Sequence, residues 1–306
     1  MKQYSRPVND ISHLVYVSHL MPRHATTKAT PPPEHAEIRP GQSIELLKAL
    51  HILTRDGKLN QDSRRKLKQV YHLYQFIEPL LAQVTQECAV QLADVGAGKS
   101  YLGFILYDLF FKARSDASHI YGIEARSELV QKSVALARTL HFERMTFLDR
   151  PVAEAIACAQ LPEKLDIVTA LHACDTATDD AIRFALNKQA RFIVLAPCCQ
   201  AEVAAVLRKN KGAALADPLT NPLIEAWRHP LHTREFGSHI TNVLRCLQLE
   251  AHGYQVNVTE LVGWEHSLKN ELIIASYQDL PRERAATRLR AMLDTLGLDA
   301  LRPRFS

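Results

Sequence analysis

The chain has 306 residues and a formal net charge of +4 at pH 7. Its hydrophobic residues (47%) and charged residues (23%) occur in the proportions of an ordinary soluble globular protein. No apolar run approaches the roughly 20 residues that a membrane-spanning helix needs, so we expect no membrane association. The six cysteines are scattered without a disulfide framework, which predicts reduced thiols in a cytoplasmic protein. The positive charge permits a nucleic-acid partner but does not require one.

The N-terminal part of the chain, residues 1–60, is predicted to be an extension that contains a linker. Its Thr- and Pro-rich stretch over 25–41 is unsuited to regular structure, and a short amphipathic helix is expected over 43–55. A clear helix follows over 61–86, and its first turns carry the cations Arg64, Arg65, Lys66 and Lys68. This basic face either points into solvent or contacts phosphates beside an active site.

The next stretch has the pattern of a strand, a tight glycine turn and a helix. The apolar run ends at Val95, Gly96-Ala97-Gly98 forms the turn, and a helix is predicted over 100–111. This arrangement brings backbone N–H groups and a helix N-terminus against a nucleotide-like ligand. One interpretation is a relaxed P-loop, in which Lys99 holds phosphates and Ser100 holds a magnesium ion.

Two acidic residues around this turn favour a different ligand. Asp94 stands at the tip of the strand, where a P-loop has no acid. The next predicted strand, over 119–124, ends in Glu124, which could accept hydrogen bonds from both hydroxyls of a ribose. Together they resemble the Asp-x-Gly-x-Gly turn and the following ribose-binding acid of class I methyltransferases that use S-adenosylmethionine.

Helices and strands alternate through the rest of the chain, which predicts a parallel sheet. Further strands are expected over 145–148, 165–171, 191–196, 255–262 and 271–277. Helices are expected over 127–140, 151–159, 178–188, 201–210, 238–252 and 281–297, with an irregular insertion over 212–236. The last two strands are joined by a loop too short for a helical crossover, so they should be antiparallel.

We therefore expect an α/β fold with a Rossmann-like, seven-stranded sheet that ends in an antiparallel hairpin. The predicted domain covers residues 61–280, and a C-terminal helix occupies 281–306.

From Lys66 to Tyr277 the chain resembles class I methyltransferases. Within them it is similar to the methyltransferase-domain group that includes several methyltransferase-like proteins and a tRNA 2′-O-methyltransferase branch. The residues that carry the resemblance are Asp94–Ser100, Leu171-His172-Ala173-Cys174-Asp175 with Thr178-Asp179, Ala196-Pro197-Cys198-Cys199 and Lys269-Asn270. Asp175 is a departure, because a glycine is common at that position in the group, and it predicts a narrower or more acidic mouth of the site.

The resemblance implies S-adenosylmethionine as the cofactor. The expected binding residues lie in the glycine turn and after the neighbouring strands, and they are Asp94, Gly96, Ala97, Gly98, Glu124, Ala125, Asp149, Leu171 and His172. Asp149 could contact the adenine amino group, could cap the helix over 151–159, or could do both.

The expected catalytic residues are His172, Cys198 and Cys199, which follow two neighbouring strands and should lie near the transferred methyl group. In one interpretation the cysteines only pack beneath the site, and His172 lines its wall. In a second, a cysteine attacks carbon-6 of a pyrimidine and so activates carbon-5. In a third, these residues bind zinc together with Cys174, although neither cysteine pair has the usual spacing.

The sequence thus predicts a methyltransferase that acts on RNA. Cationic segments over 64–68, 208–211 and 282–290, together with the resemblance, motivate RNA as the partner. The alternatives are a protein methyltransferase, a P-loop nucleotidase and a non-catalytic cofactor-binding module. No Asn/Asp-Pro-Pro-Tyr motif follows the fourth predicted strand, so the sequence does not indicate transfer to an exocyclic amino group.

Overall fold

The computed structural model describes residues 37–306 apart from 172, 198–199, 211–221 and 262–270. Residues Glu37–Ser306 form one compact unit. Most of the extension predicted over 1–60 lies outside the described residues, and the domain boundaries at 60 and 280 stay predictions. Within the described part of the chain, no helix is long and apolar enough to cross a bilayer.

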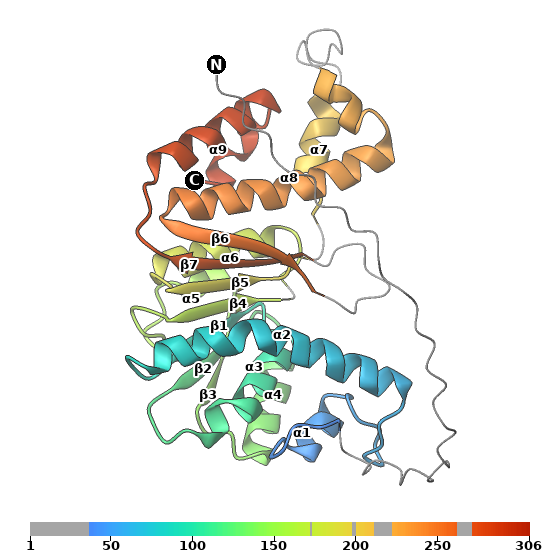
Figure 1. Ribbon diagram of the computed structural model, residues 1–306, viewed down its shortest axis with the longest axis vertical. Coiled ribbons are helices and arrows are strands. Elements are labelled where there is room, and N and C mark those ends of the chain that lie inside the picture. Colours follow the sequence, from blue (N-terminus) through green and yellow to red (C-terminus); the bar gives the residue numbers. More distant parts are fainter. Residues whose placement is uncertain (1–36, 172, 198–199, 211–221, 262–270) are drawn as a thin grey trace, which may run out of the picture. The chain divides into compact units, whose positions relative to one another are not determined.

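A seven-stranded sheet lies at the centre of this unit (Figure 1). The strands are β1 (Gln91–Val95), β2 (His119–Glu124), β3 (Met145–Asp149), β4 (Ile167–Ala170), β5 (Phe192–Leu195), β6 (Tyr254–Glu260) and β7 (Glu271–Tyr277). Their order across the sheet is β3-β2-β1-β4-β5-β7-β6. The first five strands of this order run parallel, whereas β7 runs antiparallel to both β5 and β6. This confirms the predicted Rossmann-like sheet with its terminal antiparallel pair.

Helices cover both faces of the sheet (Figure 1). They are α1 (Ile44–Ala49), α2 (Gln61–Thr85), α3 (Tyr101–Leu109), α4 (Ser127–Thr139), α5 (Val152–Ala155), α6 (Thr176–Asn187), α7 (Glu202–Lys209), α8 (Pro230–Ala251) and α9 (Glu283–Thr295), with short 3-10 turns at η1 (Phe111–Ala113), η4 (Pro222–Trp227) and η5 (Asp299–Arg304).

The side chains of β1 alternate between two hydrophobic cores. Leu92 packs into the core that contains α1, α2, α3 and α4. Ala93 and Val95 pack into the core on the other face, which contains α5 and α6. Burial on both faces explains why the parallel strands have continuous apolar sequences. A third core joins α7, α8 and α9 at the side of the antiparallel strands.

Helix α8 differs from the prediction, because it begins at Pro230 rather than at residue 238. The irregular insertion predicted over 212–236 is therefore wrong in its last part. Proline is tolerated at the first helical position, where an N–H group would have no intrahelical partner. Gly237 lies inside α8 and allows α7 to approach closely, since a Cβ atom there would lie 2.7 Å from the backbone nitrogen of Ala204.

The substitution Gly237→Ala is expected to lower the free energy of unfolding by about 1–3 kcal/mol, because the added methyl group meets the backbone of Ala204. Helix propensity alone would predict a gain of up to about 1 kcal/mol. Urea denaturation gives the sign of the change. His239→Ala, at an exposed position of α8, is the control and should shift stability by less than about 0.5 kcal/mol. A stabilised Gly237→Ala protein would contradict the close helix contact.

Candidate functional site

The predicted cofactor residues that the structure describes follow strands that end at one edge of the sheet, because parallel strands all end on the same side. In the strand register, Asp94 of β1 lies beside Gly122 of β2, and Glu124 of β2 lies beside Asp149 of β3. Strand β1 also pairs with β4, so the turn that follows Ala170 lies on the other side of the glycine turn. This edge is where open α/β sheets bind their ligands.

The glycine turn folds toward both neighbouring strands. Gly96 and Gly98 have positive φ angles of 64° and 58°, which glycine adopts without strain. The N–H of Ala97 donates to a carbonyl oxygen of β2 at 3.0 Å, and the N–H of Gly98 donates to Glu124 Oε2 at 2.8 Å. A Cβ atom on Gly96 would lie 3.5 Å from the Cβ of Ala173, so the turn after β4 lies against the glycine turn.

Ser100 does not have the arrangement that the P-loop interpretation requires. Its side chain is buried under α3, where Oγ lies 2.7 Å from the position of a Cβ atom on Gly103. The hydroxyl has no hydrogen-bond partner. Because it is directed into the core, it is badly placed to ligate a magnesium ion beside a phosphate. This position favours the methyltransferase interpretation of the turn.

Asp94 is buried beneath the turn, with 3% of its surface exposed. The hydroxyl of Thr169 on β4 donates to its Oδ1 at 2.9 Å. Burial raises the pKa of Asp94 to about 7, and the hydrogen bond from Thr169 only partly opposes this shift. The carboxyl group therefore changes its charge near neutral pH.

Glu124, at the end of β2, is held in its charged form. The backbone N–H of Gly98 and that of Arg126 donate to its carboxylate, and the Arg126 guanidinium donates to both oxygens at 2.8 and 3.2 Å. Burial alone would raise the pKa of Glu124, but the hydrogen bonds from Arg126 and Gly98 outweigh it and lower the pKa. Two acids at one edge thus differ in charge because their partners differ.

The remaining predicted cofactor residues lie around these two acids. Asp149 is the exposed last residue of β3, Ala125 is exposed, and Leu171 is partly buried after β4. The alternative that Asp149 caps the next helix is wrong, because α5 is capped by Pro151 with no side-chain hydrogen bond. That helix is also shorter than expected, since it ends at Ala155.

The residues with a predicted catalytic role, His172, Cys198 and Cys199, lie outside the described residues, as do Lys269 and Asn270. The packing, nucleophile and zinc interpretations of this cluster therefore stay predictions. Among the side chains that the structure does describe, no group of three or more His, Cys, Asp or Glu could hold a metal ion.

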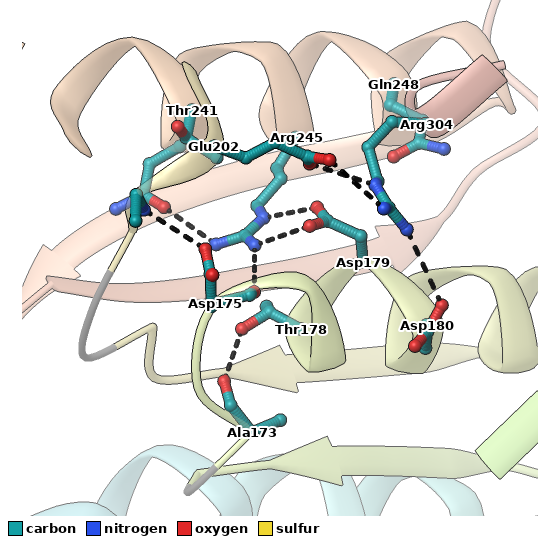
Figure 2. A network of polar contacts seen from close by, with 12 residues as sticks. Ala173, Asp175, Thr178, Asp179, Asp180, Glu202, Thr241, Arg245, Gln248 and Arg304 are labelled. Atoms are coloured by element: carbon teal, nitrogen blue, oxygen red, sulfur yellow. Dashed lines mark hydrogen bonds and ion pairs between the residues drawn. The ribbon is translucent and has the colours of Figure 1, made fainter. Parts of the chain in front are cut away.

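A buried polar network that was not predicted from the sequence lies beside these turns (Figure 2). Arg245 of α8 is fully buried and forms a two-point ion pair with Asp179 of α6, at 2.7 and 2.8 Å. Its guanidinium also donates to the carbonyl oxygen of Asp175 at 2.8 Å. Burial raises the pKa of Asp179, and the hydrogen bonds from Arg245 oppose the shift. The signal in the sequence was an arginine among the apolar positions of a predicted helix.

Asp175 has a backbone conformation that suits glycine, the residue that the resemblance led us to expect at this position. Its φ and ψ angles are 52° and −124°, a region that only glycine adopts easily. Holding another residue there costs of order 1–3 kcal/mol. The Asp175 carboxylate accepts a hydrogen bond from the N–H of Ala201, in the turn after β5, at 3.1 Å. The side chain thus links two turns and is not simply an extra negative charge at the mouth.

The raised pKa of Asp94 predicts a pH-dependent stability. The folded protein binds a proton at Asp94 up to pH about 7, whereas the unfolded chain releases it near pH 3.8. Stability from this group is therefore complete below pH about 4 and is lost as pH rises to about 7, by at most about 4 kcal/mol.

The Tm of the wild type is thus expected to fall relative to that of Asp94→Asn between pH 4 and pH 8. Asparagine keeps the acceptor for Thr169 and cannot ionise, so other titrating groups cancel in the comparison. A constant difference in Tm across this range would show that Asp94 has an ordinary pKa.

Comparison with known proteins agrees with this geometry. Residues 65–206 match the family model described as a methyltransferase domain. No curated protein matches the sequence. The matched segment runs from α2 to α7 and includes the glycine turn, Glu124 and the turn after β4.

Three solved structures illustrate the similarity of fold. Magnesium protoporphyrin IX methyltransferase from Synechocystis PCC 6803, with S-adenosylhomocysteine bound, is 16% identical with a TM-score of 0.41, and the match covers 76% of this chain and 93% of that chain. A methyltransferase from Podospora anserina is 11% identical with a TM-score of 0.43, and the match covers 76% of this chain and 88% of that chain. An rRNA methylase from Streptococcus thermophilus is 12% identical with a TM-score of 0.40, and the match covers 66% of this chain and 95% of that chain.

The family match, and not these distant structures, carries the assignment. It falls on the segment in which the sheet brings the glycine turn and the acid after β2 together. Residues 65–206 of the chain thus have the sequence pattern of a methyltransferase domain.

Proposed function

We propose that S-adenosylmethionine lies across the glycine turn, with its ribose hydroxyls on Glu124, its adenine beside Asp149 and its methyl group toward the turn after β4. The cofactor supplies an electrophilic methyl group on a sulfonium. Gly96, Ala97 and Gly98 would leave room for it, because their backbone carries almost no side-chain bulk. The buried Asp94 supports the turn from beneath, and Ala125, Leu171 and His172 complete the surroundings.

The Arg126 guanidinium is bound to the carboxylate oxygens of Glu124 that would accept hydrogen bonds from the ribose hydroxyls. Arg126 is the exposed member of the pair, with 62% of its side chain exposed, whereas the Glu124 side chain is only 9% exposed, so Arg126 can leave the carboxylate without opening the fold. Ribose hydroxyls can therefore displace the guanidinium, and the N–H of Gly98 would keep Glu124 in place when they do.

Removal of this competitor is expected to tighten cofactor binding. Arg126→Met should lower the Kd for S-adenosylhomocysteine by up to about fivefold, measured by calorimetry. Glu124→Gln should raise the same Kd by about tenfold or more, because a charged acceptor is lost. Lys132→Met, at an exposed position of α4, is the control and should change nothing. Weaker binding by Arg126→Met would mean that Arg126 contacts the ligand instead.

We infer further that the acceptor of the methyl group is RNA, from the cations on the first turns of α2. Three of these cations, Arg64, Arg65 and Lys68, line an open groove of about 670 Å³ along α2, together with Gln69, His72, Gln75 and Glu37, the ion-pair partner of Arg64. Cations that neutralise phosphates supply most of the sequence-independent affinity of a protein for RNA. Amide and imidazole groups beside them offer hydrogen bonds to the backbone or bases. This groove is the observation that carries the proposal.

The first turns of α2 lie close to the cofactor turn. Lys66 Nζ donates to the carbonyl oxygen of His51 at 3.3 Å, and the hydroxyl of Tyr101 donates to that of Leu50 at 2.8 Å. Tyr101 is the first residue of α3, directly after the glycine turn. Residues 50–51 therefore connect the basic end of α2 with the turn that would hold the cofactor.

The other two cationic segments, over 208–211 and 282–290, lie on elements other than α2. Helix α9 follows the end of β7, which is antiparallel, so α9 begins at the opposite edge of the sheet. Its cations therefore give a control that matches the charge of the α2 groove without bordering the glycine turn. The segment over 208–211 includes the end of α7, where Arg208 and Lys209 are exposed.

The test incubates the purified enzyme with tritiated S-adenosylmethionine and with separate RNA and protein fractions of a cell extract. RNA should be labelled. The double variant Arg65→Gln/Lys68→Gln should raise the KM for RNA and reduce the slope of log KM against log salt by about 1.4, for two phosphate contacts.

Arg284→Gln/Arg290→Gln on α9 should leave both quantities unchanged, and the KM for the cofactor should stay constant in all variants. Label in protein alone would replace RNA by a protein acceptor. If both double variants changed the KM for RNA and its salt dependence equally, the α2 groove would not be the specific RNA-binding surface.

A further inference from the structure

Arg245 lies where three segments at the carboxyl edge of the sheet come together (Figure 2). The first is the turn after β4, whose Asp175 carbonyl oxygen accepts from Arg245 Nη2 at 2.8 Å. The second is the turn after β5, because the Asp175 carboxylate accepts the N–H of Ala201. The third is the start of β7. Arg245 Nη1 donates to Asn242 Oδ1 at 3.2 Å, and Asn242 Nδ2 donates to Glu271 Oε2 at 2.7 Å.

The turn after β4 is fixed on both sides of Cys174. The Ala173 carbonyl oxygen accepts from the hydroxyl of the buried Thr178 at 2.5 Å, and the Asp175 carbonyl oxygen accepts from Arg245. Asp175 has a backbone conformation that a non-glycine residue keeps only when its surroundings hold it. The guanidinium supplies that restraint from below the turn.

A contribution to stability is a weak explanation for such a pair. Taking both charges out of water offsets much of their attraction, and well-packed apolar residues of similar volume often serve stability equally well. The planar guanidinium instead offers several donors in a fixed geometry, which suits it to hold separate groups in register. Its hydrogen bonds reach a carboxylate, a side-chain amide and a backbone carbonyl.

We propose that Arg245 is a positioning residue for methyl transfer, because its buried guanidinium holds the turn after β4 and, through Asp175 and Asn242, the turn after β5 and the start of β7. These segments carry or flank the residues expected near the methyl group. In-line displacement is sensitive to small errors of alignment, so a looser turn lowers the rate of transfer more than the affinity for the cofactor. The proposal rests on the methyltransferase domain and needs no particular acceptor.

The test replaces the ion pair by apolar residues, in the double variant Arg245→Met/Asp179→Leu, so that no charge is left buried alone. Arg191→Met/Glu87→Leu is the matched control. It removes another two-point pair, with both distances 2.8 Å, at the start of β5 on the opposite edge of the sheet. Both proteins are compared with wild type at temperatures equally far below their Tm values.

Hydrogen–deuterium exchange gives a result that requires no acceptor. Peptides that cover residues 173–176 and 200–202 should exchange about tenfold faster in the Arg245→Met/Asp179→Leu protein, while peptides over β1 and β2 should not change. The control pair should leave the same peptides unaffected. Unchanged exchange in both turns would overturn the proposal.

Kinetics on the labelled acceptor fraction then separate positioning from stability. We expect kcat to fall about tenfold or more in the Arg245→Met/Asp179→Leu protein, with the Kd for S-adenosylhomocysteine within about threefold of wild type. Arg245→Lys should recover little, because an ammonium cannot make the same set of bonds. Full kcat in a protein of normal Tm would reduce the ion pair to a structural role. Absence of label in RNA would defeat only the RNA proposal, since the exchange result still decides the role of Arg245.

Discussion

Parallel pairing of β1 with both β2 and β4 is the constraint on which the site depends. Because these strands run in the same direction, their ends deliver the glycine turn, Glu124 and the turn after Ala170 to one edge of the sheet. A Cβ atom on Gly96 would stand 3.5 Å from the Cβ of Ala173, so the glycine turn and the turn after β4 lie against each other. The N–H of Gly98 on Glu124 then fixes the distance between the first two of these elements. The part of the site where we propose that the cofactor binds is therefore built mainly from backbone, with few side chains.

Three acidic side chains at this edge, Asp94, Glu124 and Asp179, have different kinds of hydrogen-bond partner. Asp94 accepts hydrogen bonds from the Thr169 hydroxyl and the Gly103 backbone, but burial outweighs them and pushes it toward its neutral form. Glu124 has backbone donors and an exposed guanidinium, which keep it charged and leave part of its carboxylate available to a competing ligand. Asp179 has the fully buried Arg245, a partner that no ligand from solvent can displace without opening the fold. The arrangement at Glu124 suits binding and release, whereas the arrangement at Asp179 suits permanent order.

Much of the fold could be predicted from the sequence, because local patterns and tertiary packing agree in the parallel half of the sheet. Strand β2 has the predicted bounds, since its apolar run ends in an acid that the fold needs at that place. The start of α8 could not be predicted in this way. Pro230 and Gly237 usually interrupt helices, and only the first-turn position of the proline and the contact with Ala204 make them acceptable here. The glycine turn and its acids could be proposed as a site from the sequence, whereas the role of Arg245 could not, because its partners are distant in sequence.

Asp175 shows how a departure from a family pattern and a buried network can belong together. A glycine at this position would adopt the backbone conformation without strain, but it would leave the turn after β5 without the acceptor that holds the N–H of Ala201. An aspartate makes that link and brings strain of order 1–3 kcal/mol, which something else in the fold must offset. The guanidinium of Arg245 is bonded to the carbonyl oxygen of this same residue. Asp175 and Arg245 therefore act together. The Asp175 carboxylate joins the turns after β4 and β5, and the buried guanidinium keeps the strained backbone of Asp175 in the conformation that allows this link.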